Sequence, residues 1–262
     1  MRVNTDFLLE ATPERIFAVL KLIAFNKYTR SEIQAFIQPN NEKGTACDTV
    51  LNYCRQCDWI SVDDDQKYEL VIPKDYIKDI QTFRRWVNKF LFEGDNTWFY
   101  EFTKWYMSQD ESILQYTLKD VVGVFPQVLE DTNDKSILYW RLWSSFLGFG
   151  NLQKVGNGSR FTPNPYIRIE DVLALDQELE RNISIPFKEF IVWLIGSCPE
   201  LKDCIKDHSL TTFLSLALRV MYDRKMIDLE YHQDSTDIWY LTTNHLHEIE
   251  GKVTHIVIKG VK

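Results

Sequence analysis

Residues 49–70, TVLNYCRQCDWISVDDDQKYEL, join a helical segment to a short hairpin. In the first half, Val50, Leu51 and Cys54 recur at helical spacing and indicate one buried side. In the second half, apolar and polar residues alternate on either side of the acidic turn at 63–65, which is typical of a β-hairpin. A helix that leads directly into a hairpin is how a winged helix-turn-helix ends, so this stretch predicts that fold.

The residues before this stretch supply the other parts of the same fold. Thr12 and Pro13 form a good helix start, and apolar residues recur at helical spacing to about Asn26. A second, short helix is expected at 29–38, with Thr29 or Ser31 as its N-cap. Helix, short helix, helix and hairpin is the winged-helix order. We therefore expect an N-terminal winged-helix domain over residues 1–75.

The C-terminal stretch, residues 168–262, repeats this order and predicts a second winged-helix domain. An apolar helix begins near Pro186, a short helix follows at 199–205, and Ser209 caps a long third helix. Two alternating strands are then expected around the turn QDST, with Ile238–Leu241 in the place of the earlier strand KYEL. The polar segment 168–183 resembles a linker helix, and the last residues are expected to add one further short helix or strand.

The central stretch, residues 76–167, predicts a helical or winged-helix-like domain. Helices are expected at 79–92 and 96–107, then before Pro126 and again over about 135–147, and a hairpin follows at 151–163 with Asn157-Gly158 as its turn. The expected fold class is thus mostly α with short β-hairpins, arranged as tandem winged helix-turn-helix units. The aromatic residues of the central helices are interpreted as core, with a subunit interface as the alternative.

Composition indicates the cellular compartment of the protein. The chain has 262 residues, a formal net charge of −8 and five cysteines. No apolar run has the length that a membrane span needs, and the first residues contain no apolar signal core. An odd number of cysteines without disulfide spacing is typical of a reducing compartment. We therefore expect a cytoplasmic protein that does not contact a membrane.

One stretch departs from the acidic average. Residues 135–169 contain five cations and no Asp or Glu, which favours a local contact with phosphates. The alternative is that this composition merely reflects an interior segment rich in Trp, Phe and Leu. If the patch is real, the expected DNA-binding residues are Lys135, Tyr139, Arg141, Lys154, Asn157, Ser159, Arg160 and Arg168.

The third helices of the two terminal domains offer polar side chains as well. We expect the exposed set to be Lys43, Thr45, Thr49, Asn52, Arg55 and Gln56 in the first domain, and Thr211, Thr212, Ser215 and Arg219 in the last. Each helix is followed by an acidic hairpin that phosphates would repel. The terminal domains are therefore expected to contact protein rather than DNA.

No catalytic, metal-binding or nucleotide-binding constellation stands out. The glycines at 148–158 follow a helix and precede a hairpin, which is the wrong context for a phosphate-binding loop. Cys54 and Cys57 are interpreted as packing residues, with a shared zinc as the alternative. His245, His247 and His255 leave a metal-dependent nuclease or hydrolase open as a rival hypothesis. We expect no enzyme, no cofactor and no bound metal.

Three phrases carry a family resemblance: YWRLWSSFLGFG at 139–150, FKEFIVWLIGSCPEL at 187–201 and PERIFAVLKLIAFNKYTRSEIQAFI at 13–37. With the tandem layout, they resemble DpdG-like proteins, which are encoded in prokaryotic phage-defence and deazaguanine DNA-modification islands. The resemblance implies a non-enzymatic partner of larger restriction or helicase-type proteins, and it carries over no catalytic residues. A rival resemblance is to the tandem winged-helix subunits that clamp kleisin proteins in chromosome-condensing complexes.

These observations lead to two functional hypotheses. The first is a winged-helix adaptor subunit of a multiprotein DNA-acting system, for phage defence or restriction, that binds larger protein subunits and the DNA backbone. The second is a pure protein-interaction module with no DNA contact, as a monomer or a homodimer.

Overall fold

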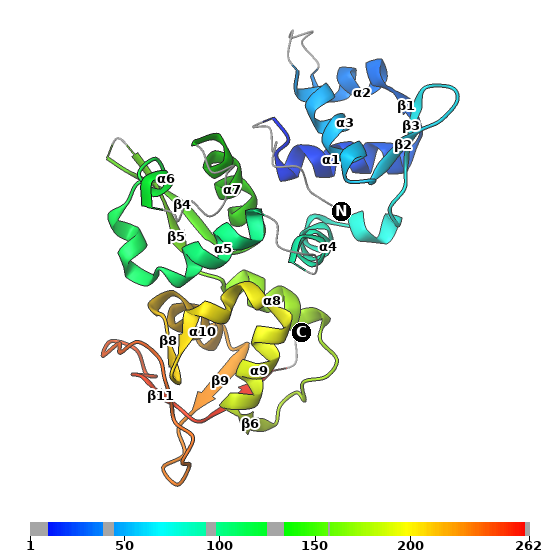
Figure 1. Cartoon of the computed structure of the whole chain (residues 1–262). Helices are drawn as coiled ribbons and strands as arrows, with labels where there is room; N and C mark the ends of the chain where they lie inside the picture. The colour runs from blue at the N-terminus through cyan, green and yellow to red at the C-terminus, as the bar shows by residue number, and fades with distance from the viewer. Residues whose placement is uncertain (1–9, 39–44, 93–97, 125–133, 157, 260–262) are drawn as a thin grey trace. The chain divides into compact units, whose positions relative to one another are not determined.

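A computed structural model describes residues 10–38, 45–92, 98–124, 134–156 and 158–259 (Figure 1). The chain forms two compact units: residues 1–98 with 126–146, and residues 99–125 with 147–262. These boundaries differ from the three expected ranges, because the expected central domain, 76–167, contributes to both units. No helix in the described part of the chain is long and apolar enough to cross a membrane.

The first unit begins with alternating helices and short strands. Its elements, in chain order, are α1 (Pro13–Phe25), β1 (Tyr28–Thr29), α2 (Arg30–Ile37), α3 (Ala46–Gln56), β2 (Ile60–Val62) and β3 (Lys67–Leu70). The strands form one antiparallel sheet in the order β1-β3-β2. The expected succession of helix, short helix, helix and hairpin is confirmed, with β1 as an added third strand.

Local chemistry explains where these elements begin. Thr12 accepts a hydrogen bond from the Arg15 backbone at the start of α1, and Thr29 forms a capping box with Glu32 at the start of α2. Between α3 and β2 the chain turns at Asp58, whose φ of 55° lies in the left-handed region. This corner lets a helix run directly into a strand.

The rest of the first unit packs on an aromatic core. It comprises η1 (Lys74–Ile77), α4 (Ile80–Phe92) and α7 (Asp134–Phe146). The buried Trp59 ring lies 4.9 Å from the Trp86 ring and 5.6 Å from the Tyr53 ring, between centroids. The helices expected at 79–92 and 135–147 are therefore confirmed, and within the described residues these side chains form core.

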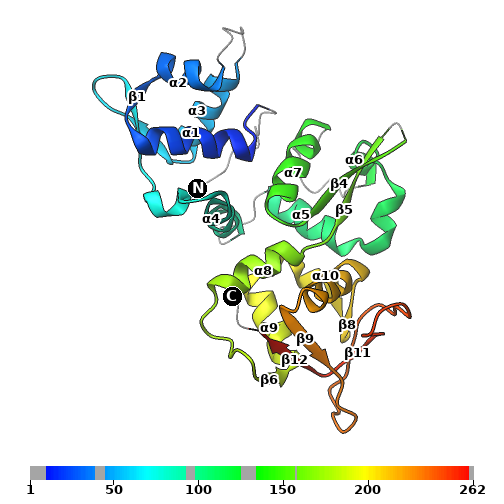
Figure 2. The same cartoon turned by 180° about the vertical axis from the view of Figure 1, so that it is seen from behind.

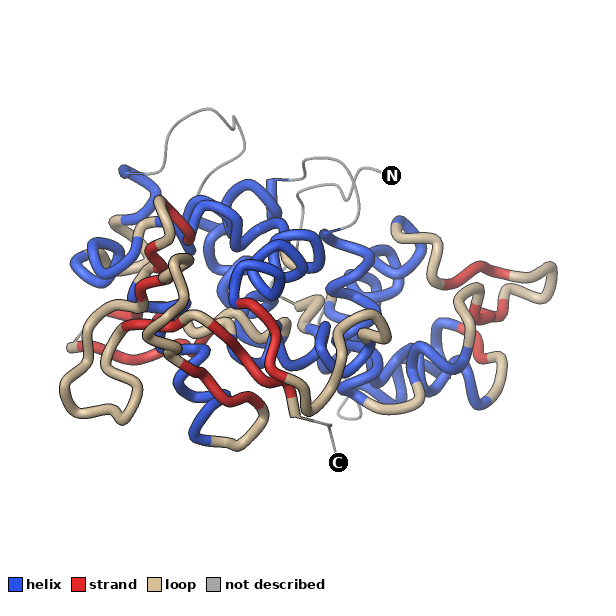
Figure 3. Tube along the Cα trace, turned by 90° about the horizontal axis from the view of Figure 1, so that it is seen from below, coloured by secondary structure: helices blue, strands red, loops and turns tan. Residues whose placement is uncertain are grey.

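The second unit contains helices around small sheets. Its elements are α5 (Trp98–Ser108), η2 (Asp110–Gln115), α6 (Val121–Val124), β4 (Gly150–Val155), β5 (Gly158–Pro163), α8 (Tyr166–Leu175), β6 (Ser184–Pro186), α9 (Phe187–Ser197), η3 (Pro199–Cys204), β7 (Ile205–Lys206), β8 (Ser209–Leu210), α10 (Thr212–Asp223), β9 (Ile227–Glu230), β10 (Trp239–Tyr240), β11 (Lys252–Val253) and β12 (His255–Ile258). The tube drawing in Figure 3 shows how short the strands are beside the helices. The expected class, mostly helix with short strands, is confirmed.

Strand pairing in the second unit corrects one expectation. Strand β9 pairs with β12, not with the strand at 238–241, and the sheet order is β6-β12-β9 (Figure 2). Strand β10 pairs instead with β11 and β8, in the sheet β11-β10-β8-β7. The physical reason is burial: Ile256, Val257 and Ile258 of β12 are all buried and take the central position.

Candidate nucleic-acid interface

Strands β4 and β5 form a regular two-stranded hairpin. Six residue pairs run from Gly150 opposite Pro163 to Val155 opposite Gly158. Gly158 therefore belongs to strand β5, opposite Val155, and not to the turn as expected. Gly156 has a φ of 58°, which suits a tight hairpin turn, and Asn157 lies outside the described residues.

The hairpin is fixed along β5 and exposed along β4. The buried Phe161 anchors β5, and its carbonyl accepts a hydrogen bond of 2.8 Å from the Tyr106 hydroxyl. The Ser159 carbonyl accepts one of 3.0 Å from the Leu118 backbone. Residues 151–155 of β4 are all exposed. The hairpin is thus packed against the second unit through β5, while β4 is exposed to solvent.

The two cations of the hairpin lie on opposite faces. Residues directly opposite each other in an antiparallel pair share a face, and neighbours along a strand alternate. Lys154 pairs with Ser159, and Gln153 pairs with Arg160. Lys154 and Arg160 therefore point to opposite sides of the ribbon. Each face carries one cation together with hydroxyl or amide groups.

Within the described residues, no ion pair engages either cation of the hairpin. Residues 135–169 contain no Asp or Glu, and neither Lys154 nor Arg160 forms an ion pair with any residue that the structure describes. The Nε atom of Arg160 is buried and has no hydrogen-bond partner in this part of the chain. Lys154 is exposed and Arg160 is half-buried.

The residues expected on the preceding helix belong to the first unit, in α7. Lys135 is exposed and Arg141 is half-buried, whereas Tyr139 is only 8% exposed. The expectation that Tyr139 is offered to DNA is therefore wrong, because its ring contributes to the core. The expected patch is divided between two units: Lys135, Tyr139 and Arg141 lie in α7 of the first unit, and Lys154, Ser159 and Arg160 lie in hairpin β4–β5 of the second.

Arg168 is also wrongly placed in the expected interface. It is 4% exposed, and its Nε donates a 2.9 Å hydrogen bond to the fully buried carboxylate of Glu200. Its Nη2 donates to the carbonyl of Ser197 at 3.2 Å. A phosphate cannot reach this guanidinium. The sequence gives no sign of the pair, since the two residues lie in different elements 32 positions apart.

Helix α3 presents few polar side chains that could contact DNA. Arg30 forms a bidentate pair with Asp48, at 2.5 and 2.6 Å, and Thr45 and Thr49 both donate to the Glu10 carboxylate. Thr49 is buried, contrary to expectation. Exposed Asn52, Arg55 and Gln56 remain, while Lys43 lies outside the described residues.

Helix α10 cannot act as a reading helix with the expected residues. Ser215 and Arg219 are buried, which corrects the expectation that they are exposed. The Arg219 guanidinium donates to the carbonyls of Thr242, Ile249 and Glu250, at 2.7, 3.1 and 2.9 Å. It supports the loop that follows β10 instead of facing a ligand.

The candidate metal ligands are not brought together. Within the described residues, no group of three or more His, Cys, Asp or Glu is placed to hold a metal ion. Cys54 and Cys57 are buried, and burial raises the pKa of the Cys57 thiol to about 12, so it stays protonated. The His247 ring contacts Asp223, and the His255 ring stacks on His232.

Comparisons with known proteins add no assignment. No protein-family model matches the chain, and neither a curated protein nor a solved structure is significantly similar to it. The resemblances to DpdG-like proteins and to kleisin-binding subunits therefore stay expectations from the sequence. The hairpin β4–β5 is the described element whose geometry and charge best suit a nucleic-acid contact.

Proposed function

We propose that this protein is a non-enzymatic adaptor of a prokaryotic DNA-acting system. In this role, hairpin β4–β5 contacts the DNA backbone. The acidic terminal modules, residues 1–75 and 168–262, contact larger protein subunits. The observation that carries the proposal is the pair of cations Lys154 and Arg160 on opposite faces of one hairpin, neither of which forms an ion pair with the described residues.

The geometry of the hairpin supports this reading. The major groove of B-DNA admits a two-stranded β-ribbon, and a ribbon with one cation on each face has a positive charge for each wall of the groove. Phosphate contacts of this kind fix position without reading sequence. The exposed amides of Asn151 and Gln153 add hydrogen-bonding groups along the same ribbon.

We further propose that the terminal modules are winged helices. In the first, the order α1-β1-α2-α3-β2-β3 and the sheet order β1-β3-β2 support this assignment. In the last, α9, η3 and α10 precede β9 and β12. These two strands pair with each other, and β12 lies at the centre of the sheet β6-β12-β9. Two of their cations are engaged within the modules: Lys27 pairs with Asp63 and Glu69, and Arg219 is buried. This supports protein contacts there, as in adaptor subunits.

A pure protein-interaction module is the second candidate function. The observation that favours it is the net charge of −8, which repels nucleic acid over most of the surface. The two candidates differ in one measurable property, because only the first predicts DNA affinity that depends on the hairpin cations.

The test is a fluorescence-anisotropy titration of duplex DNA with the full chain. Two phosphate contacts predict that affinity falls about tenfold between about 50 and about 200 mM salt. The double variant Lys154→Glu/Arg160→Glu should bind at least about tenfold more weakly at the lower salt concentration, and its salt dependence should be shallower by about two contacts.

A matched control separates the local effect from net charge. Lys188 and Lys206 are exposed cations outside the hairpin, so Lys188→Glu/Lys206→Glu changes the net charge by the same amount. This control should retain most of the wild-type affinity. If both double variants lose binding equally, or if the wild type does not bind at low salt, the hairpin proposal is overturned and the protein-interaction module leads.

A further inference from the structure

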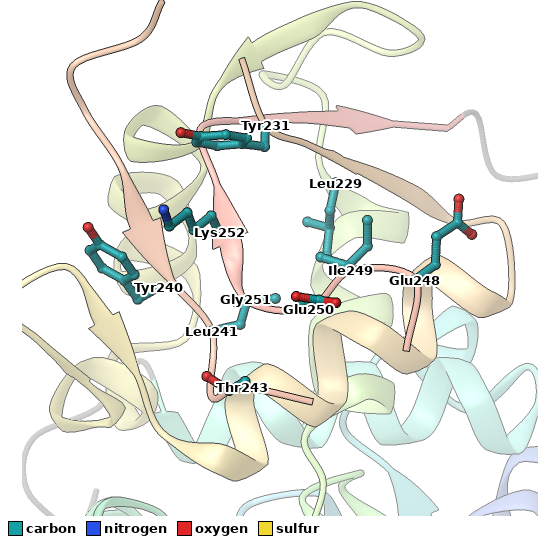
Figure 4. Close-up of a pocket in the computed structure, with 10 residues that line it drawn as sticks. All are labelled: Leu229, Tyr231, Tyr240, Leu241, Thr243, Glu248, Ile249, Glu250, Gly251 and Lys252. Atoms are coloured by element: carbon teal, nitrogen blue, oxygen red, sulfur yellow. The ribbon is translucent and has the colours of Figure 1, made fainter. Parts of the chain in front are cut away.

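A pocket of about 490 Å³ opens in the second unit between β9, β10 and the loop that leads into β11 (Figure 4). Its volume lies in the range of small ligand sites. The floor is apolar: Leu229 and Leu241 are buried, and Ile249 lies beside them. The pocket therefore has an apolar floor that suits one apolar side chain.

The loop that forms one wall, residues 241–251, is held in place by hydrogen bonds from α10. The buried Arg219 guanidinium donates to the carbonyls of Thr242, Ile249 and Glu250. Within the loop, the Asn244 amide donates to the Glu250 carbonyl at 2.9 Å. Because several hydrogen bonds fix its backbone, this wall is preorganised rather than shaped by an occupant.

The other wall is an open strand edge. The Leu241 amide donates to the Gly251 carbonyl at 2.7 Å, so these two residues are a hydrogen-bonded pair and the next pair, Tyr240 with Lys252, is not. The main-chain groups of Lys252 consequently point away from β10. Since β11 is the edge strand of its sheet, these groups can pair with an added strand.

The rim of the pocket is negative overall. Glu248, Glu250 and Lys252 line it, and the Lys252 ammonium lies 5.8 Å from the centroid of the Tyr231 ring. Desolvation and the neighbouring Glu248 carboxylate raise the pKa of the Tyr222 hydroxyl, whereas Glu250 forms no ion pair with the described residues. Tyr231 and Tyr240 are 42% and 44% exposed. A cation would find a carboxylate and aromatic faces here, and a phosphate would be repelled.

We propose that this pocket binds an extended segment of a partner protein that adds a strand beside β11. The segment places an apolar side chain over Leu229 and Ile249, and a lysine or arginine two residues away beside Glu250. This inference rests on the protein-binding half of the proposed function, for which it names a site and a partner chemistry. It is independent of the DNA contact, because the hairpin takes no part in it.

The probe is a capped pentapeptide, Thr-Leu-Thr-Lys-Thr, titrated into the methyl-labelled full chain and followed by NMR. We expect saturable shifts of the methyl signals of Leu229, Leu241 and Ile249. A peptide with glutamate in place of lysine should bind about tenfold more weakly, because like charges meet at the rim. A peptide with serine in place of leucine should also lose affinity, because the apolar floor stays uncovered.

Glu250→Lys should weaken binding of the lysine peptide about tenfold and strengthen binding of the glutamate peptide. The exposed Glu178 of the same unit gives the matched control, since Glu178→Lys makes the same charge change elsewhere and should bind like the wild type. The proposal is overturned if no methyl in the floor responds, if both peptides bind equally, or if duplex DNA or self-association of the chain produces the shifts. Unchanged DNA affinity in Glu250→Lys keeps this outcome separate from that of the hairpin test.

Discussion

Replacing Arg168 by methionine is expected to lower the free energy of unfolding of the second unit by about 3–5 kcal/mol near neutral pH. Arg168 and Glu200 are both buried, and one guanidinium–carboxylate contact of 2.9 Å joins them. The Oε2 atom of Glu200 has no hydrogen-bond partner among the described residues. Without Arg168, a buried carboxylate is left with no compensating charge.

The deficit should depend on pH in a defined direction. Burial raises the pKa of the Glu200 carboxyl above its usual value, and Arg168 partly offsets this rise. Removing Arg168 raises that pKa further in the folded state, so the folded variant holds a proton that the unfolded chain releases. Stability is then retained at low pH and lost as pH rises through the raised pKa. Denaturant unfolding at about pH 5 should show a smaller deficit than at about pH 8.

Two comparisons make this expectation specific. Arg224 is exposed, with its guanidinium 4.6 Å from the centroid of the Tyr166 ring, and Arg224→Met should cost no more than about 1 kcal/mol. Adding Glu200→Leu to Arg168→Met should recover much of the loss, because no unpaired charge remains. If Arg168→Met unfolds like the wild type at both pH values, the buried pair does not have the role described.

Arg219→Met is expected to lower the free energy of unfolding of the second unit by about 3 kcal/mol. Three loop carbonyls lose a charged donor, and methionine fills the space without satisfying them. Arg219→Lys should be intermediate, because an ammonium keeps the charge but not the planar fork.

Hydrogen exchange should locate the effect. The amides of Leu241 and Asn244 donate to carbonyls of the same loop, so their exchange should accelerate in Arg219→Met beyond what the global loss of stability explains. Amides of β4 and β5 serve as internal controls. Exchange that accelerates uniformly across the second unit would show that Arg219 does not specifically hold this loop.

Local signals predicted much of the fold. Helix starts at Thr12 and Thr29 depend on neighbouring residues in the chain, and the hairpin of β2 and β3 depends on alternation around a polar turn. Such features can be read from a few consecutive residues. The pairing of β9 with β12 could not be predicted in this way, because residues 231–254 separate the two strands and contain another strand with the same alternation.

The candidate interface was predicted only in part for the same reason. The absence of acids over residues 135–169 pointed to Lys154 and Arg160, but it did not distinguish exposed cations from Arg168, which pairs with a distant carboxylate. Likewise, the burial of Arg219 depends on a loop that follows it by 23–31 residues in the chain. The pocket beside β11 is lined by residues from β9, β10 and the loop before β11. No short sequence motif indicates it.

The most direct test of the central claim is photo-crosslinking to duplex DNA at low salt, with p-azidophenylalanine introduced at one exposed position at a time. Gln153 lies on hairpin β4–β5, Asn52 lies on α3, and Gln177 provides the background. The account predicts crosslinks from position 153 that are lost in the Lys154→Glu/Arg160→Glu background, with only background yield from the other two positions. Crosslinks from position 52 without any from position 153 would contradict it, because DNA would then lie against α3 and not against the hairpin.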